Sequence, residues 1–131
     1  MRYIFLIYSR EQDRASMSAE EGQAIRTQHW AVQDESGRKG VLHAAQPLQP
    51  TNTATSVRMQ DGKPLIVDGP FAETKEQLGG FYLLECRDLD EAIGWAAKIP
   101  GAQSGSVEVR PVMDYEAMRG DGAGAAATSQ A

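Results

Sequence analysis

Arg2-Tyr-Ile-Phe-Leu-Ile-Tyr8 is the stretch of sequence that constrains the fold most. Its aromatic and branched residues favour a β-strand, in which successive side chains point to opposite faces. Both faces of this strand are apolar, with Tyr3, Phe5 and Ile7 on one and Ile4, Leu6 and Tyr8 on the other. A second run, Phe81-Tyr-Leu-Leu-Glu-Cys86, has the same property. Two such strands require cover on both sides of the sheet that contains them.

Two helices are predicted, each beginning at a capping residue. Ser18-Ala-Glu-Glu21 has the form of a capping box, and a helix should run from there to about Gly37. Asp88-Leu-Asp-Glu91 repeats the pattern and predicts a second helix, which must end near Pro100-Gly101.

Four more strands follow from local patterns. Asp61-Gly62 suits a tight turn, so the runs on either side of it predict a β-hairpin. The predicted strands are Val41–Ala45, Ser56–Gln60, Lys63–Val67 and Ser106–Val112. Between the hairpin and Phe81, we expect residues 72–80 to form a polar loop or a short helical turn that ends in a glycine pair.

This order of elements predicts an α+β fold of the ferredoxin-like kind, an antiparallel sheet with two helices on one face. The chain itself then covers only that face. Leaving the second apolar face in water would forfeit roughly 25 cal/mol per Å² of apolar surface. A second copy packed sheet to sheet would cover it and produce a dimeric α+β barrel. Alternatively, some of the aromatic residues line a ligand cavity, and both interpretations can hold together.

The composition limits the class of protein. A chain of 131 residues has room for one domain, expected over residues 1–118, with a flexible tail over residues 119–131 that is rich in Gly and Ala. The net charge of −5 opposes binding to nucleic acid, and no apolar run is long enough to cross a membrane. The lone Cys86 and the absence of a signal-peptide pattern predict a cytoplasmic protein.

The run Asp68-Gly-Pro-Phe-Ala-Glu-Thr-Lys-Glu-Gln-Leu-Gly-Gly80, with the later Gly105-Ser-Val-Glu-Val-Arg-Pro111, closely resembles the DGPF group of the YCII-related family. The opening strand is also similar to that group, so the resemblance spans roughly residues 1–113. It implies a ferredoxin-like domain assembled as a dimeric α+β barrel. It also implies a site made of a histidine and an aspartate, which falls on His29 by position and on Asp68 by the motif.

The sequence pattern gives His29 an inward position. Residues at steps of four, three and four share one helix face, and that stripe is Ile25, His29, Val32 and Ser36. A carboxylate beside a histidine fixes its tautomer and makes it a general base or acid. The alternative is that His29 bonds to the backbone and that Asp68 caps the turn before Gly69-Pro70.

The candidate ligand-binding residues are Tyr8, His43, Phe71 and Glu76. His43 could approach the same cleft, Glu76 lies in the motif loop, and Tyr8 and Phe71 could line an apolar cavity. The alternatives are packing for the aromatic residues and simple solvation for the loop charges. Two histidines without a close-spaced partner predict no metal site, and no sequence motif indicates a cofactor.

Two functions from different classes follow. In the first, a small organic acid or lactone undergoes proton transfer, with His29 as base and Asp68 orienting it, as the resemblance to lactone-processing isomerases and lyases implies. In the second, the chain is a non-catalytic dimeric regulatory or interaction module. The resemblance to proteins whose genes often neighbour extracytoplasmic-function sigma factors implies that second function.

Overall fold

A computed structural model describes residues 1–120 of the chain. The predicted tail over residues 119–131 lies almost wholly outside the described residues. The elements in chain order are β1 (Arg2–Ser9), α1 (Glu11–Ala15), α2 (Ala19–Arg38), β2 (Leu42–Pro47), η1 (Thr51–Thr53), β3 (Thr55–Gln60), β4 (Lys63–Asp68), β5 (Gln77–Glu85), α3 (Leu89–Lys98), α4 (Gly101–Ser104), β6 (Ser106–Pro111) and α5 (Tyr115–Gly120).

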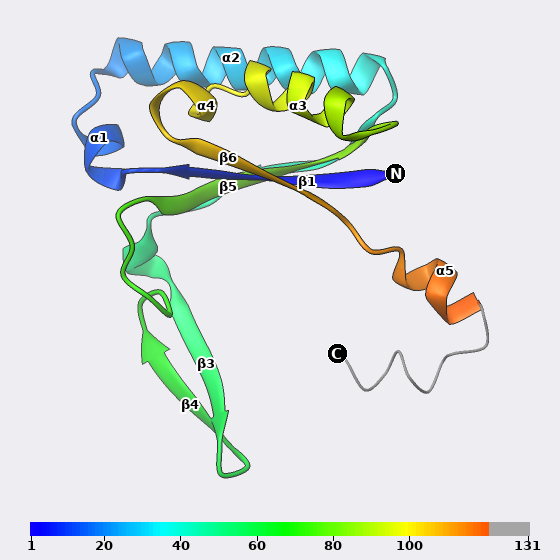
Figure 1. Cartoon of the computed structure of the whole chain (residues 1–131). Coiled ribbons are helices and arrows are strands. Elements are labelled where there is room, and N and C mark those ends of the chain that lie inside the picture. The colour runs from blue at the N-terminus through cyan, green and yellow to red at the C-terminus, as the bar shows by residue number, and fades with distance from the viewer. Residues whose placement is uncertain (121–131) are drawn as a thin grey trace.

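The main sheet has the order β2-β5-β1-β6, and every neighbouring pair is antiparallel. Helices α2, α3 and α4 all lie on one face of it (Figure 1). The predicted ferredoxin-like α+β fold is therefore confirmed. Within residues 1–120, no helix is both long and apolar enough to cross a membrane.

The covered face of the sheet holds the core. Phe5 lies opposite Tyr82 of β5 and Val109 of β6, and its side chain is 0% exposed. Trp95 of α3 and Ile99, which directly follows that helix, complete the core on the helical side. Val32 and Ser36 of α2 are buried as the predicted stripe requires, and the Ser36 hydroxyl donates to the Val32 carbonyl oxygen at 2.8 Å.

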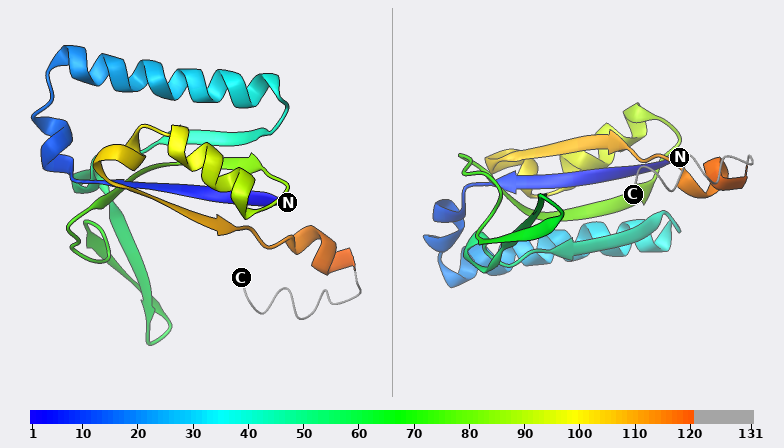
Figure 2. Two further views of the ribbon diagram at one scale, coloured as in Figure 1. Left: turned by 45° about the horizontal axis from the view of Figure 1, so that its top comes forward. Right: turned by 90° about the horizontal axis from the view of Figure 1, so that it is seen from below.

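The opposite side of the sheet, here called the open face, carries the alternate residues of the same strands. Ile4 is paired with Leu83, and Leu6 with Phe81, so these four side chains share that face. All four are partly exposed. Figure 2 (right) looks onto this face, where the strands lie side by side behind the hairpin and no helix of residues 1–120 crosses them.

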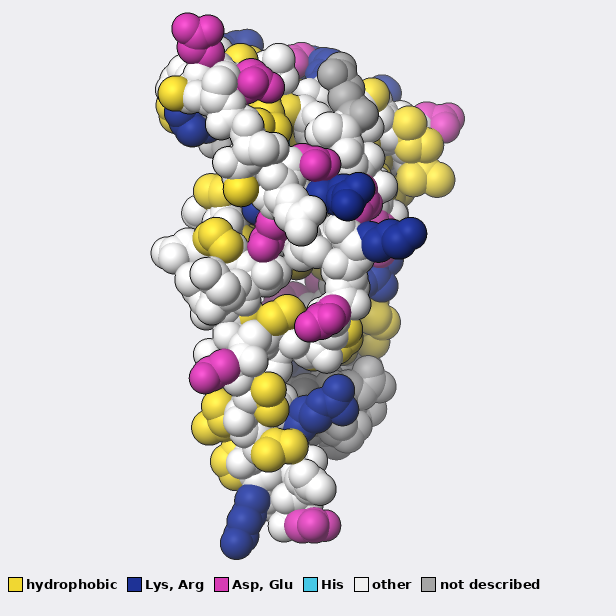
Figure 3. Space-filling model, turned by 90° about the vertical axis from the view of Figure 1, so that its left-hand side faces the viewer, with side chains coloured by type: hydrophobic (Ala, Val, Ile, Leu, Met, Phe, Trp, Pro, Cys, Tyr) yellow, Lys and Arg dark blue, Asp and Glu magenta, His cyan; other side chains and the backbone are white. Residues whose placement is uncertain are grey.

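Strands β3 and β4 form the predicted hairpin, with Asp61 at φ 52° and Gly62 at φ 77° in its turn. Positive φ at both positions suits the twist of a two-residue hairpin, and Asp and Gly tolerate it best. The hairpin extends away from the sheet on the side opposite the helices (Figure 1). Hydrophobic side chains lie along this narrow arm (Figure 3), and Met59 and Ile66 are 68% and 63% exposed.

Both predicted helix caps are confirmed. The Glu21 amide donates to the Ser18 hydroxyl at 3.1 Å, and the Ser18 amide donates back to the Glu21 carboxylate at 3.3 Å. The Glu91 amide donates to the Asp88 carboxylate at 2.9 Å. These bonds satisfy donors that every helix leaves free at its first turn.

The predicted loop over residues 72–80 is wrong in its last part, because β5 begins at Gln77 rather than at Phe81. The Gly79-Gly80 pair does not end a loop. It lies within β5 and lets this strand pass close to β2. A Cβ on Gly80 would lie 2.9 Å from the carbonyl oxygen of Gln46. Strand β2 accordingly extends to Pro47, two residues beyond its predicted end.

Helix α1 lies between the first predicted strand and the first predicted helix, where no helix was predicted. Long-range hydrogen bonds hold it in place. The Glu11 amide donates to the Gln77 side chain at 3.0 Å, and the Glu11 carboxylate accepts from the amide and hydroxyl of Thr51 at 2.8 and 3.0 Å. A five-residue helix is too short to be stable alone, so these distant partners decide that it forms.

Candidate functional site

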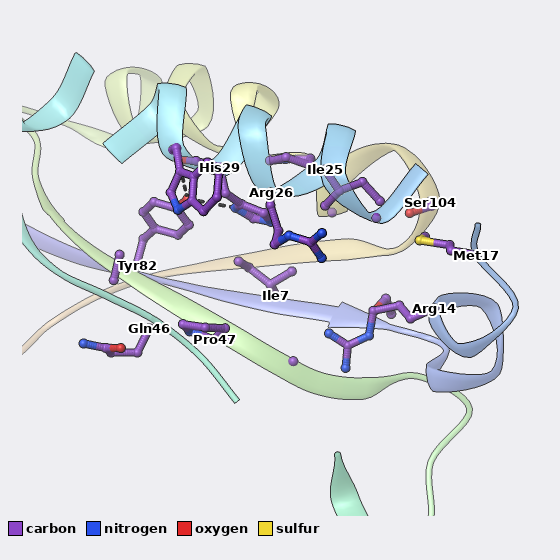
Figure 4. A pocket seen from close by; sticks show the side chains of 18 of the residues that line it. Ile7, Arg14, Met17, Ile25, Arg26, His29, Gln46, Pro47, Tyr82 and Ser104 are labelled. Carbon is purple, nitrogen blue, oxygen red and sulfur yellow. Dashed lines mark hydrogen bonds between the residues drawn. The ribbon is translucent and has the colours of Figure 1, made fainter. Parts of the chain in front are cut away.

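A cavity of about 840 Å³ opens between α2 and the sheet, on the covered side. Its walls come from β1, α1, α2, β2, β5 and α4. Figure 4 shows the side chains that point into it, with Ile7 on the floor and Ile25 and His29 on the roof. A volume of this size suits a small organic molecule.

His29 and Tyr82 form the central pair of this cavity. The capped helix α2 presents His29 toward the sheet, and Tyr82 rises from β5 to meet it. His29 Nδ1 lies 2.8 Å from the Tyr82 hydroxyl, and that hydroxyl lies 3.3 Å from the backbone carbonyl oxygen of His29. The two rings are stacked, with centroids 5.9 Å apart.

Burial sets the charge state of both groups. It lowers the pKa of His29 below its ordinary 6.5, because the imidazolium would lose water. It also raises the pKa of Tyr82 above 10.0, against a smaller opposing effect of Gln33. At neutral pH the pair therefore consists of a neutral imidazole and a neutral phenol.

The Tyr82 hydroxyl has only one proton to donate. This limits how its contacts with His29 Nδ1 and with the His29 carbonyl oxygen can both be hydrogen bonds. If Nδ1–H donates to the phenol oxygen, the phenol O–H is free to donate to the His29 carbonyl oxygen. Nε2 then carries the lone pair of the imidazole. Within residues 1–120 Nε2 has no hydrogen-bond partner, and no buried side-chain nitrogen or oxygen there is unsatisfied. Nε2 is thus accessible and can accept a proton.

Two arginines add positive charge to the cavity wall. Arg14 comes from α1 and Arg26 from α2, one turn before His29. No aspartate or glutamate is among the described residues that line the cavity. The lining is therefore basic, although the whole chain carries a net charge of −5.

The structure does not bring Asp68 to His29. Asp68 ends β4 on the projecting hairpin, where it is exposed, and it does not line the cavity. Tyr82 occupies the place beside His29 where a carboxylate was expected. The reason is the hairpin, which carries Asp68 away from the covered side of the sheet (Figure 1).

The four expected ligand-binding residues also lie outside this cavity. Tyr8 is on the open face of β1, and His43 is exposed, with Nε2 3.0 Å from the Glu85 carboxylate. Phe71 is 81% exposed beyond the end of β4. Glu76 lines a separate shallow hollow with Arg10 and Lys75, and its carboxylate accepts from the Ser106 hydroxyl at 3.3 Å.

Sequence reasoning missed the parts that Tyr82, Arg14 and Arg26 have in this cavity. Tyr82 lies in the predicted strand Phe81–Cys86, but its partner could not be inferred from the sequence. Arg26 is three residues before His29, and that spacing is a usable signal because residues three apart share a helix face. Arg14 gave no signal, since its position depends on the tertiary contacts of α1. Within residues 1–120, no group of His, Cys, Asp and Glu side chains could hold a metal ion.

Two comparisons with known proteins found a match. The family model for the YCII-related domain matches residues 1–116. The chain is also 41% identical over 118 residues to an uncharacterized protein of Rhizobium meliloti (strain 1021), covering 88% of this chain and 95% of that protein. Since the family model matches most of the chain, this protein belongs to the family of the YCII-related domain.

Proposed function

We propose that the chain binds a small organic molecule in the cavity under α2 and that His29 transfers a proton to or from it. The observation that carries this proposal is the 2.8 Å contact between His29 Nδ1 and the Tyr82 hydroxyl, because it leaves Nε2 of this cavity-lining residue without a hydrogen-bond partner within residues 1–120. A neutral imidazole that is held by one nitrogen and free at the other is the arrangement a general base requires.

Tyr82 is a positioning residue in this proposal. Its hydroxyl holds Nδ1, and its ring stacks on the imidazole, so the direction of Nε2 is set before the ligand arrives. The lowered pKa of His29 keeps the base unprotonated at neutral pH. The reaction class supported best is the removal of a proton next to a carbonyl group. In an isomerase the proton then returns at another carbon, and in a lyase a leaving group departs with its electron pair as the double bond forms.

The test is proton exchange in heavy water on a panel of small carbonyl compounds, pyruvate, 2-oxobutyrate, levulinate and α-angelica lactone, followed by proton NMR. His29→Ala should abolish protein-dependent exchange while the circular dichroism spectrum stays unchanged. Tyr82→Phe keeps the ring and removes the hydroxyl, so we expect roughly 10²-fold slower exchange, within the usual contribution of general base catalysis.

His43 is the matched control, since the chain has only two histidines. It lies outside the cavity, so His43→Ala should exchange as the parent does. If His29→Ala were as active as the parent, the proton-transfer proposal would be wrong. If no compound exchanges with the parent protein, a non-catalytic binding module becomes the better function.

A homodimer is the second part of the proposal, supported by the open face and the hairpin. An isolated two-stranded hairpin is marginally stable in water, yet β3 and β4 expose Val57, Met59 and Ile66. The open face also presents Ile4, Leu6 and Phe81 without a helix over them. A second copy that packs sheet to sheet would cover both surfaces with matching apolar groups.

The dimer is tested by sedimentation of the parent chain and of Ile66→Asp at several concentrations. The parent should sediment as a dimer, and the charge on the hairpin should shift it toward the monomer. Thr55→Asp, on the same hairpin but near its base, is the matched control. A parent chain that remains monomeric at about 100 μM would contradict the dimer, since stable homodimers associate far below that concentration.

A further inference from the structure

We infer that the molecule bound under α2 is a small organic carboxylate, whose carboxylate group is held by Arg14 and Arg26. This inference rests on the proposed function and specifies the class of its ligand. The two guanidinium groups reach the same space from different elements, Arg14 from α1 and Arg26 from α2 (Figure 4). Planar guanidinium groups with paired N–H donors match the geometry of a carboxylate.

The charges of Arg14 and Arg26 are not neutralised by a carboxylate among the described residues. Within residues 1–120, no ion pair involves Arg14 or Arg26. Arg26 donates to the Gln23 side chain at 3.0 Å, which leaves other N–H groups of its guanidinium available. Two cations beside an apolar cavity without a carboxylate among its described lining residues form a site that favours an anion.

Gly79 makes room for the Arg14 guanidinium. A Cβ at Gly79 would lie 2.9 Å from Arg14 Nη1, 3.3 Å from Cζ and 3.4 Å from Nη2. The guanidinium therefore rests against the backbone of β5, at a point where a side chain would displace it. The two glycines therefore make room for different groups. The absence of a side chain at Gly80 lets β2 approach, and its absence at Gly79 leaves space for the Arg14 guanidinium.

The rest of the cavity favours a carboxylate over a phosphate. A phosphate site commonly uses the free amides at a helix N-terminus. Here Ser18 and Glu21 of α2 bond to each other, and Glu20 and Glu21 add negative charge to that first turn. The apolar side chains around the arginines suit a hydrocarbon body, and they include Ile7, Met17, Ile25 and Trp30.

The arrangement also explains how such a ligand would meet the base. Arg26 and His29 are three residues apart on α2, so they lie on the same face of the helix, less than one turn apart. A carboxylate held at Arg26 places the neighbouring carbon atoms toward Nε2 of His29. The arginines would thereby select the ligand and orient it, while His29 performs the chemistry.

The experiment measures binding by NMR titration with three probes of similar shape, phenylacetate, phenylacetamide and phenyl phosphate. Phenylacetate should bind, phenylacetamide about tenfold more weakly, and phenyl phosphate no more tightly than phenylacetate. Arg14→Met and Arg26→Met should each weaken phenylacetate about tenfold and leave phenylacetamide unchanged. Arg38→Met, on the same helix but outside the cavity, is the matched control.

A second pair of variants tests position instead of charge. Gly79→Ala should displace the Arg14 guanidinium and weaken phenylacetate with all charges retained. Gly94→Ala on α3 is its control, because a Cβ at Gly94 meets nothing within 4 Å. If Arg14→Met does not fold, Gly79→Ala and Arg26→Met still decide the matter.

Several results would overturn the inference. They are equal affinity for phenylacetate and phenylacetamide, tighter binding of phenyl phosphate, unchanged phenylacetate affinity in Arg26→Met and Gly79→Ala, or no binding of phenylacetate up to about 10 mM. These binding results are separate from turnover. A chain that binds phenylacetate through Arg14 and Arg26, but shows no His29-dependent proton exchange, would keep the carboxylate site and refute the proton transfer.

Discussion

The two faces of the main sheet are built from alternate residues of the same strands, yet residues 1–120 bury only one of them. On the covered face Phe5 and Leu84 are 0% exposed beneath α2 and α3. On the open face their chain neighbours Leu6 and Leu83 remain partly exposed. Both faces carry apolar side chains, so the difference in exposure arises because α2 and α3 cover one face and no helix of residues 1–120 covers the other.

The contrast teaches where function can reside in such a fold. The covered face gains its stability from packing, and the cavity occurs where α2 stands away from β5 near the glycine pair. The open face has no comparable cover from the described residues, and the hairpin extends on that side (Figure 1). Our proposals therefore assign ligand chemistry to the first face and association to the second.

The largest expected effect comes from truncating the covered core. Phe5→Ala should lower the free energy of unfolding by about 3–5 kcal/mol, because it removes a fully buried ring and leaves a void. Leu6→Ala is the matched change on the open face and should cost the monomer only about 1 kcal/mol. Urea denaturation of both variants measures the difference.

The same pair of variants sharpens the contrast when the protein concentration is varied. If a second copy covers the open face, the cost of Leu6→Ala should grow with concentration, since association then adds to stability. The cost of Phe5→Ala should include a large part that does not depend on concentration. Equal costs for the two variants under all conditions would contradict the distinction between the faces.

A smaller effect on stability is expected from the N-cap of α3, the helix whose Trp95 packs on the covered core. Asp88→Ala removes the acceptor of the Glu91 amide and should lower the free energy of unfolding by about 1 kcal/mol. Asp88→Asn is the control, because asparagine caps a helix nearly as well. Thermal unfolding followed by circular dichroism measures both, and a large loss in Asp88→Asn would show that the charge of Asp88 matters more than its cap.

The smallest effect is the pH dependence that His29 introduces on the covered side. Its folded pKa is lowered below 6.5, so as the pH falls below that value the unfolded chain takes up a proton more readily than the folded one. This contribution to stability is therefore complete above 6.5 and is lost progressively toward the lowered folded pKa. His29→Gln should flatten this part of the curve in urea denaturation between pH 5 and pH 8, and unchanged curvature would contradict it.

Local signals in the sequence were sufficient for the framework of the fold. The capping residues Ser18 and Asp88, and the Asp61-Gly62 turn, are interactions between near neighbours, so the sequence alone can predict them. The inward stripe with His29 follows from helix geometry in the same way. Helix α1 and the first residues of β5 were not predicted, because their partners lie far away in the chain.

For the candidate site, the sequence by itself indicated one residue, a histidine that faces inward from α2. Only the tertiary structure decided its partner, because Tyr82 lies 53 residues farther along the chain and comes within 2.8 Å only because α2 lies over the sheet that contains β5 (Figure 1). The same packing placed Arg14 beside Gly79 and carried Asp68 away on the hairpin. The physical reason is that periodicity fixes the direction of a side chain within its own element, whereas its neighbours depend on contacts between distant elements.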